Sequence, residues 1–236
     1  MFLTKTAGIF LVAAICLFSS CKRGKELSMQ PTDGYPRIET REEVRELLAD
    51  KCLDTISFRS GEVIADIGAG NGYLEAMLAM FYEDLTFYIQ DIDSSVCNQA
   101  AVEDEVEFYE GIAGKPFSSR FFAINGTDKE SGLPDIEFDR VLMLWTYQYL
   151  KEPRIFITDL RSKLKEGGIL YVINPEQDYE YGLELRDKYG WNCSTIERQI
   201  SDIIDCGFCL IRVARNYEDN QQPYIMVFRK GQSPRS

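Results

Sequence analysis

Residues 63–78 read VIADIGAGNGYLEAML, and this stretch decides the fold. The residues before Gly68 are typical of a buried strand, and the apolar spacing after Gly72 is typical of a helix. A glycine-rich turn therefore joins a strand to a helix. Glycines allow backbone angles and a close approach that side chains forbid, and a helix that follows offers unpaired N–H groups. We expect a ligand to lie against this turn.

The spacing of the glycines and the charge beside them narrow the class of ligand. Dinucleotide sites use the pattern G-x-G-x-x-G, but here the last position of that pattern is Tyr73, since the glycines are at 68, 70 and 72. Asp66 stands directly before the turn, where its carboxylate would repel a pyrophosphate and suit a ligand with an ammonium group. S-adenosylmethionine is such a ligand.

A second acid, Asp91, ends the next predicted strand, 23 residues beyond Gly68. This is close to the offset of about 20 residues at which an acid binds ribose hydroxyls in nucleotide-binding folds. The alternative is that Asp91 caps a helix or turn, since Asp93 and two serines follow it. Together with Asp66 and the glycine turn, ribose binding is favoured.

From Thr40 onward, short apolar runs alternate with stretches of helical spacing, which is typical of a mostly parallel sheet covered on both faces. Thr40 and Glu43 form a capping-box pattern that begins the first helix. A polar turn alone joins the last two strands, which indicates one antiparallel strand. The predicted strands are 63–67, 85–89, 121–124, 141–145, 169–173, 208–213 and 224–228, and the predicted helices include 73–81, 153–164 and 180–204.

These motifs together resemble those of class I S-adenosylmethionine-dependent methyltransferases. The resemblance rests on 66–72, on Asp91, on LPDIEFDRVLM at 133–143 and on LKEGGILY at 164–171, and it spans roughly residues 40–230. It implies an α/β, Rossmann-like fold: a seven-stranded, mostly parallel sheet in the order 3-2-1-4-5-7-6. The last strand is antiparallel in this fold, and helices lie on both faces.

The resemblance also implies which residues bind the cofactor S-adenosylmethionine. Asp66 would face the methionine ammonium group, Asp91 the ribose, and the segment after the third strand the adenine, where Asn125 either binds the adenine or closes a turn. The implied cofactor-binding residues are Asp66, Gly68, Gly70, Asp91, Gly126, Thr127 and Leu144.

Candidates for positioning a substrate follow the fourth strand. Trp145 either packs on the sulfonium or belongs to the core, and Tyr147 and Tyr149 either face the substrate or serve packing. The chain contains no histidine, which removes the most common general base and the commonest metal ligand. Many members of the family that this sequence resembles carry a histidine after this strand. Because methyl transfer can proceed largely by alignment of the nucleophile, activity is still expected. We predict no catalytic base and no metal site.

The first residues predict an export signal. The sequence MFLTKTAGIFLVAAICLFSSC has Lys5, an apolar run at 7–18, two serines and then Cys21, which is the plan of a signal peptide. The run is too short to span a bilayer. Its end resembles the lipobox of bacterial lipoproteins, in which Cys21 is lipidated. The predicted organisation is a signal peptide at 1–20, a tether at 21–39, a methyltransferase-like domain at 40–230 and a tail at 231–236.

The composition limits the possible partners. Apolar residues make up 45% of the chain and charged residues 27%, which indicates a folded, water-soluble body. The formal charge of −12 argues against a nucleic-acid partner. We expect a lipid-anchored protein of the cell envelope, with a secreted or periplasmic protein as the alternative and a cytoplasmic one last. Cys206 and Cys209 have the spacing of a redox or metal half-site, but two small buried side chains are favoured.

Three functions remain open at this point. The favoured one is an S-adenosylmethionine-dependent methyltransferase that acts on a small molecule or a protein side chain. The second is a non-catalytic relative that binds another adenosine-like or amino-acid ligand. The third is an envelope scaffold with a vestigial pocket, because a fold alone does not establish chemistry.

Overall fold

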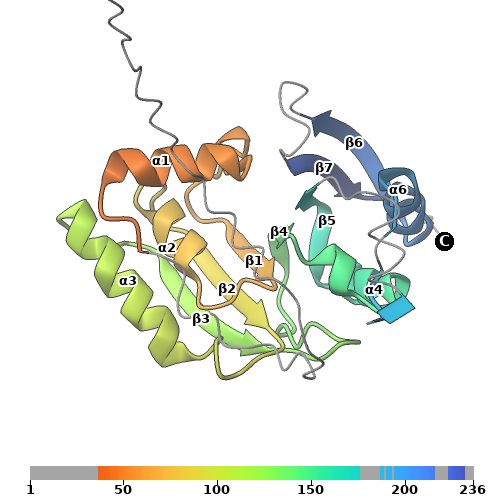
Figure 1. The fold of residues 1–236 in the computed structure, drawn as a ribbon, viewed down its shortest axis with the longest axis horizontal. Helices are drawn as coiled ribbons and strands as arrows, with labels where there is room; N and C mark the ends of the chain where they lie inside the picture. Colours follow the sequence, from red (N-terminus) through yellow and green to blue (C-terminus); the bar gives the residue numbers. More distant parts are fainter. Residues whose placement is uncertain (1–36, 176–186, 189, 193, 216–222, 232–236) are drawn as a thin grey trace, which may run out of the picture. The chain divides into compact units, whose positions relative to one another are not determined.

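A computed structural model describes residues 37–175, 187, 188, 190–192, 194–215 and 223–231. These residues contain one seven-stranded sheet in the order β3-β2-β1-β4-β5-β7-β6 (Figure 1). The strands are β1 Val63–Ile67, β2 Thr86–Asp91, β3 Arg120–Asn125, β4 Phe138–Leu144, β5 Leu164–Pro175, β6 Phe208–Arg215 and β7 Pro223–Lys230.

The strand directions confirm the predicted topology. β1 pairs in parallel with β2 and with β4, β2 pairs in parallel with β3, and β4 with β5. β7 runs antiparallel to both β5 and β6. Two strands that follow each other directly in sequence pair in this way because an antiparallel pair needs no helical crossover. The carboxyl ends of β1 to β5 therefore meet at one edge of the sheet.

Helices cover both faces of the sheet, as predicted. α1, α2 and α3 pack on one face, and α4 and α6 pack on the other (Figure 1). Neighbouring strand residues alternate between the two cores: Ile64 and Leu142 belong to the first, and Ala65 and Val141 to the second. The helices are α1 Arg41–Asp50, α2 Tyr73–Ala79, α3 Gln99–Ala113, α4 Pro153–Lys163 and α6 Ile196–Asp205, with short 3₁₀ helices η1 Leu53–Thr55 and η2 Tyr147–Tyr149.

The start of α1 follows the predicted capping box. The Thr40 hydroxyl accepts a hydrogen bond from the Glu43 N–H at 3.2 Å and donates to the Glu43 carboxylate at 2.7 Å. The apolar side chains of the helix, Val44 and Leu48, are buried in the first core. The cap and the apolar spacing together fix where this helix begins and which side faces the sheet.

The predicted helix over 180–204 is wrong in its middle part. Residues 176–186 lie outside the described residues, but 190–192, 194 and 195 are not helical. Gly190 has a φ of 71°, and the Thr195 hydroxyl accepts a hydrogen bond from the Arg198 N–H, which makes Thr195 the N-cap of α6. The glycine and the cap begin a new helix at Ile196, where apolar spacing alone predicts continuation.

Every predicted strand except the one at 63–67 differs from the structure at one or both ends, and two of these differences are described in the next sentences. β5 begins at Leu164, directly after α4, instead of at Ile169. β4 ends at Leu144, one residue earlier than predicted, because Trp145 takes up a left-handed conformation with a φ of 55°. The second difference shapes the candidate site, as described below.

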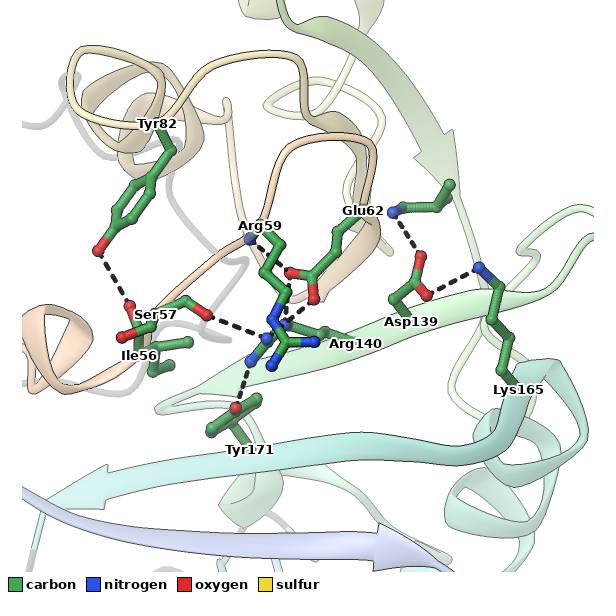
Figure 2. Close-up of polar contacts among 10 residues, drawn as sticks. Ile56, Ser57, Arg59, Glu62, Tyr82, Asp139, Arg140, Lys165 and Tyr171 are labelled. Atoms are coloured by element: carbon green, nitrogen blue, oxygen red, sulfur yellow. Dashed lines mark hydrogen bonds and ion pairs between the residues drawn. The ribbon is translucent and has the colours of Figure 1, made fainter.

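At the amino ends of the strands, Arg140 on β4 forms hydrogen bonds with three other segments of the chain (Figure 2). Its guanidinium donates to both carboxylate oxygens of Glu62 at 2.7 and 2.9 Å and to the Ser57 carbonyl at 3.0 Å. A further bond goes to the Tyr171 hydroxyl on β5. This network lies at the edge of the sheet opposite the glycine turn and supports the approach to β1.

The four described cysteines, Cys52, Cys97, Cys206 and Cys209, are free thiols. The prediction that Cys206 and Cys209 are both buried is wrong: Cys206 is half-buried and Cys209 is exposed. Cys209 lies on the edge strand β6, where alternation turns Phe208 inward and its neighbour outward. In the described part of the chain, no helix is long and apolar enough to cross a membrane.

Candidate cofactor site

The glycine turn lies at the carboxyl edge of the sheet between β1 and α2. Gly68, Gly70 and Gly72 have φ angles of 74°, 61° and 81°, which side chains disfavour. The N–H groups of Gly68 and Ala69 donate to the Gln90 carbonyl on β2 at 2.8 and 3.0 Å. The three glycines are therefore required by the backbone itself, and the turn is fixed to the neighbouring strand.

Thr146 packs directly against the turn from the end of β4. A Cβ atom on Gly68 would lie 2.3 Å from the Thr146 hydroxyl oxygen, closer than any real contact. That hydroxyl donates to the Leu144 carbonyl at 2.9 Å. The structure thus brings the end of β4 against the glycine turn. Leu144 at the end of β4 and the glycines of the turn, which are predicted cofactor-binding residues, therefore lie in neighbouring segments.

Asp91 contacts the glycine turn from the end of β2. One carboxylate oxygen accepts a hydrogen bond from the Gly70 N–H at 3.1 Å, and the other accepts from the Asp93 N–H at 3.0 Å. Both interpretations of the sequence are therefore visible: Asp91 closes the turn that follows it, and it also reaches the glycine turn. Its side chain is half-buried, so it remains accessible from the site.

Asp66 is almost completely buried at the end of β1, and it lies beside a second carboxyl group that the sequence did not single out. This is Glu75 in the first turn of α2, whose side chain is fully buried. The two carboxyl groups are within hydrogen-bonding range of each other. Burial raises the pKa of both groups, and the charge of Glu75 raises the pKa of Asp66 further.

The segment after β3 forms a tight turn beside β2. Gly126 is packed so closely that a Cβ atom would lie 2.3 Å from the Gln90 amide nitrogen and 2.6 Å from the Ser131 carbonyl oxygen. The Thr127 hydroxyl accepts from the N–H groups of Lys129 and Glu130 at 3.2 and 3.1 Å. Gly126 and Thr127 thus lie at the same edge as Asp91 and shape the turn there.

Asn125 uses its amide group within the protein. Its nitrogen donates to the Cys97 carbonyl at 3.0 Å and to the Asp91 carbonyl at 3.4 Å. The sequence leaves two roles open for Asn125, binding the adenine or closing a turn. In the structure its amide bonds backbone carbonyls of nearby segments, which corresponds to the second role. The amide fixes the end of β3 against the segment that leads to α3.

The end of β4 presents an aromatic ring with a cation on its face. Trp145 is 40% exposed, and the Lys51 ammonium nitrogen lies over its ring, 3.1 Å from the ring centroid. Burial lowers the pKa of Lys51 to about 8. Lys51 follows α1 directly, so the first helix reaches over the carboxyl edge of the sheet. Leu144, the residue before Trp145, is half-buried beside the first core.

The two predicted tyrosines have different environments. The Tyr147 side chain is fully buried in the second core, where burial raises the pKa of its hydroxyl. Tyr149 is 49% exposed, and its ring meets that of Trp191 edge to face with a centroid distance of 4.7 Å. Only Tyr149 and Trp145 of the three substrate candidates therefore present their rings to solvent.

Comparison with known proteins agrees with this arrangement. Residues 65–172, which hold the glycine turn, Asp91 and the end of β4, match the family model of a methyltransferase domain. No curated protein matches the chain. This match covers less than half of the chain, and the strand order is that of the Rossmann-like fold that the sequence predicts.

Solved structures share the fold at low identity. The chain is similar to a putative methyltransferase from Bacillus halodurans, with 14% identity, a TM-score of 0.58 and coverage of 81% of this chain and 100% of that one. A SAM-dependent methyltransferase from Aquifex aeolicus gives 17% identity, a TM-score of 0.56 and coverage of 80% and 98%. Phosphoethanolamine N-methyltransferase 2 of Haemonchus contortus, solved with S-adenosyl-L-methionine, gives 15%, 0.59, 80% and 53%.

Proposed function

We propose that this protein is an S-adenosylmethionine-dependent methyltransferase that acts on a small molecule or a protein side chain. The observation that carries the proposal is the contact between Asp91 and the Gly70 N–H, which joins an acid at the end of β2 to the glycine turn. The methyltransferase-domain match over residues 65–172 supports it independently.

The described residues fit this cofactor. Asp66 has a buried carboxylate oxygen without a hydrogen-bond donor, and the ammonium group of the ligand could donate to it. Asp91 can accept from both ribose hydroxyls, and Gly68 and Gly70 leave the backbone of the turn uncovered by side chains. Bound S-adenosylmethionine would supply a methyl group on a positively charged sulfur. The exposed ring of Trp145 offers a face for that charge.

The chemistry at this site does not depend on imidazole. The chain has no histidine, and the segment Thr146-Tyr147-Gln148-Tyr149 stands where many relatives carry one. Holding an amine, a thiol or an acidic oxygen in line with the sulfonium carbon contributes to the rate by alignment alone. Lys51, whose pKa is about 8, is an amine beside Trp145 that is partly neutral at mildly alkaline pH.

A methyl-transfer assay tests the proposal. Purified full chain is incubated with methyl-radiolabelled S-adenosylmethionine and an extract of small molecules and proteins, and labelled products are separated by size. Asp91→Ala should abolish labelling because it removes the ribose acceptor. Asp93→Ala is the matched control, since Asp93 is outside the proposed site and bonds Ser95. Labelling that persists in Asp91→Ala, or that the wild type never gives, would contradict the proposal.

A second candidate function is that of a non-catalytic protein that binds another adenosine-like or amino-acid ligand in the same pocket, or an envelope scaffold with a vestigial pocket. The absence of histidine is the observation that favours it. Ligands that raise the melting temperature without any transfer of label would indicate the binding protein. A cellular phenotype insensitive to both Asp66→Ala and Asp91→Ala would indicate the scaffold.

We further propose export, lipidation at Cys21 and attachment to the cell envelope by the lipid alone. The support is the leader sequence, since residues 1–36 lie outside the described residues. S-adenosylmethionine is made in the cytoplasm, so an exported domain would need a supply of this cofactor outside the cytoplasm. In a bacterial host, Cys21→Ser should move the chain from the membrane fraction to the soluble fraction. Equal membrane association of both forms would contradict lipid anchoring.

A further inference from the structure

The carboxyl pair behind the glycine turn is an unusual arrangement for a protein interior. Asp66 is 3% exposed and Glu75 is 0% exposed, and both oxygens of Glu75 and one of Asp66 lack a hydrogen-bond donor. Buried carboxyl groups are normally paired with a cation or fully hydrogen-bonded. Here the neighbouring polar side chain of each group is the other carboxyl group, which offers no donor while it is ionised.

Two ionised carboxylates cannot bond each other, because both only accept hydrogen bonds. A bond between them needs one proton, which makes one partner the donor. The same proton removes one of two like charges from a site shielded from water, and this lowers the energy of the pair. The geometry therefore calls for a pair that carries one proton and one negative charge.

The surroundings of the pair supply no alternative partner of opposite charge. The other titratable groups that face it are Asp91 at the end of β2 and the buried thiol of Cys97 after β2. Burial raises the pKa of Cys97 to about 11, so the thiol is neutral. Among the described residues, no lysine or arginine forms an ion pair with Asp66 or Glu75. The pair therefore has a third carboxyl group, that of Asp91, nearby and no described cation as its partner.

We propose that Asp66 and Glu75 share one proton while the pocket is empty and that the ammonium group of the incoming ligand displaces this proton. Ligand binding then releases a proton to solvent, and Glu75 acts as a positioning residue that makes the subsite specific for an amino-acid cation. The inference rests on the proposed function, because it assigns a part of the same pocket to the ammonium group of S-adenosylmethionine.

Calorimetry of the full chain tests this without any activity measurement. S-adenosylmethionine is titrated at pH 6.5 in two buffers of different ionisation enthalpy, and the difference in heat gives the protons released. The free α-amino group has a pKa of about 7.7 to 8.0, so the ligand is already protonated and the protons come from the protein. We expect release of up to about one proton per ligand and an affinity that rises with pH.

Two further ligands separate the ammonium group from the rest of the molecule. S-adenosylhomocysteine carries the same ammonium group without the sulfonium charge and should release the same number of protons. Methylthioadenosine lacks the amino-acid part and should release none. Equal heats in both buffers for S-adenosylmethionine would overturn the inference while leaving the proposed function in place. The absence of heat with all three ligands would overturn the proposed function and the inference with it.

A matched pair of variants assigns the effect to Glu75. Glu75→Gln keeps the size of the side chain and can donate to Asp66, so proton release should fall to near zero. Glu105→Gln changes another largely buried glutamate, but this one is paired with Arg37 at 3.4 Å and accepts from Asn71 at 3.0 Å. Its proton release should equal that of the wild type. The same loss in both variants would contradict a specific role for Glu75, and the wild-type measurement stands even where a variant does not fold.

Discussion

The ammonium group of Lys51 lies 3.1 Å from the centroid of the Trp145 ring, at the carboxyl edge of the sheet. Trp145 has a φ of 55°, a strained backbone for a bulky residue, and its N–H donates to the Ile173 carbonyl at 2.6 Å. The protein thus holds an aromatic face outward and covers it with its own cation. A cationic ligand has to share this face with Lys51 or move it.

Replacing Lys51 with the uncharged Lys51→Met should strengthen binding of S-adenosylmethionine relative to S-adenosylhomocysteine. Removing a positive charge near the sulfonium lowers the repulsion by about 1 kcal/mol, which corresponds to roughly a fivefold change in the ratio of affinities. Calorimetry with both ligands measures the ratio. Lys151→Met is the control, because Lys151 lies 61% exposed on the surface near Asp128. An unchanged ratio in Lys51→Met would place the sulfonium away from Trp145.

Gly68→Ala should destabilise the protein more than Gly61→Ala. Both glycines have positive φ angles, of 74° and 83°, so both substitutions strain the backbone by about 1 kcal/mol. Only at Gly68 does the new methyl group meet another residue, the Thr146 side chain at 2.3 Å, whereas nothing lies within 4 Å at Gly61. Urea unfolding should show a further loss of about 1 to 3 kcal/mol for Gly68→Ala. Equal losses would show that Thr146 moves freely.

Much of the fold follows from local patterns in the sequence. The apolar runs predict the strands. The glycine turn predicts the junction between β1 and α2, because three positions there, at every second residue, have a positive φ that favours glycine. Thr40 and Glu43 give the start of α1, since capping depends on residues close in the chain. Asp66 and Asp91 reach the turn because parallel strands end at the same edge.

The features that the sequence does not reveal depend on contacts between distant segments. The burial of Glu75 against Asp66 depends on how α2 packs on the sheet, and an acid in the first turn of a helix is ordinarily explained by the helix dipole. Trp145 has a left-handed backbone and contacts Lys51 and Ile173, which are distant from it in the sequence. One signal was available for Glu75: it interrupts the otherwise apolar run YLEAML.

The carboxyl pair makes stability depend on pH. Because the folded state raises the pKa of Asp66 and Glu75 above 3.8 and 4.5, it keeps protons that the unfolded chain releases. The contribution is full below these values and is lost as pH rises through the folded-state pKa. Each unit of upward shift costs about 1.4 kcal/mol at high pH. Urea unfolding between about pH 4.5 and about pH 8 should show a steeper decline for the wild type than for Glu75→Gln. Parallel curves would contradict the shared proton.

Arg140→Ala should lower the free energy of unfolding by about 2 to 4 kcal/mol, because it leaves the largely buried carboxylate of Glu62 without its partner. Lys115→Ala is the comparison: its ion pair with Glu83 joins two exposed side chains and should contribute less than about 1 kcal/mol. Chemical denaturation measures both. A similar small effect of the two substitutions would show that the Arg140 network is not a structural support of β1.

The central claim is that the glycine turn, Asp66 and Asp91 form a pocket for S-adenosylmethionine. Titration of the purified full chain with S-adenosylmethionine in a calorimeter tests it most directly. We expect saturable binding at a single site, and a loss of that binding in Asp91→Ala but not in Asp93→Ala. The absence of heat at millimolar ligand with the folded wild-type protein would contradict it.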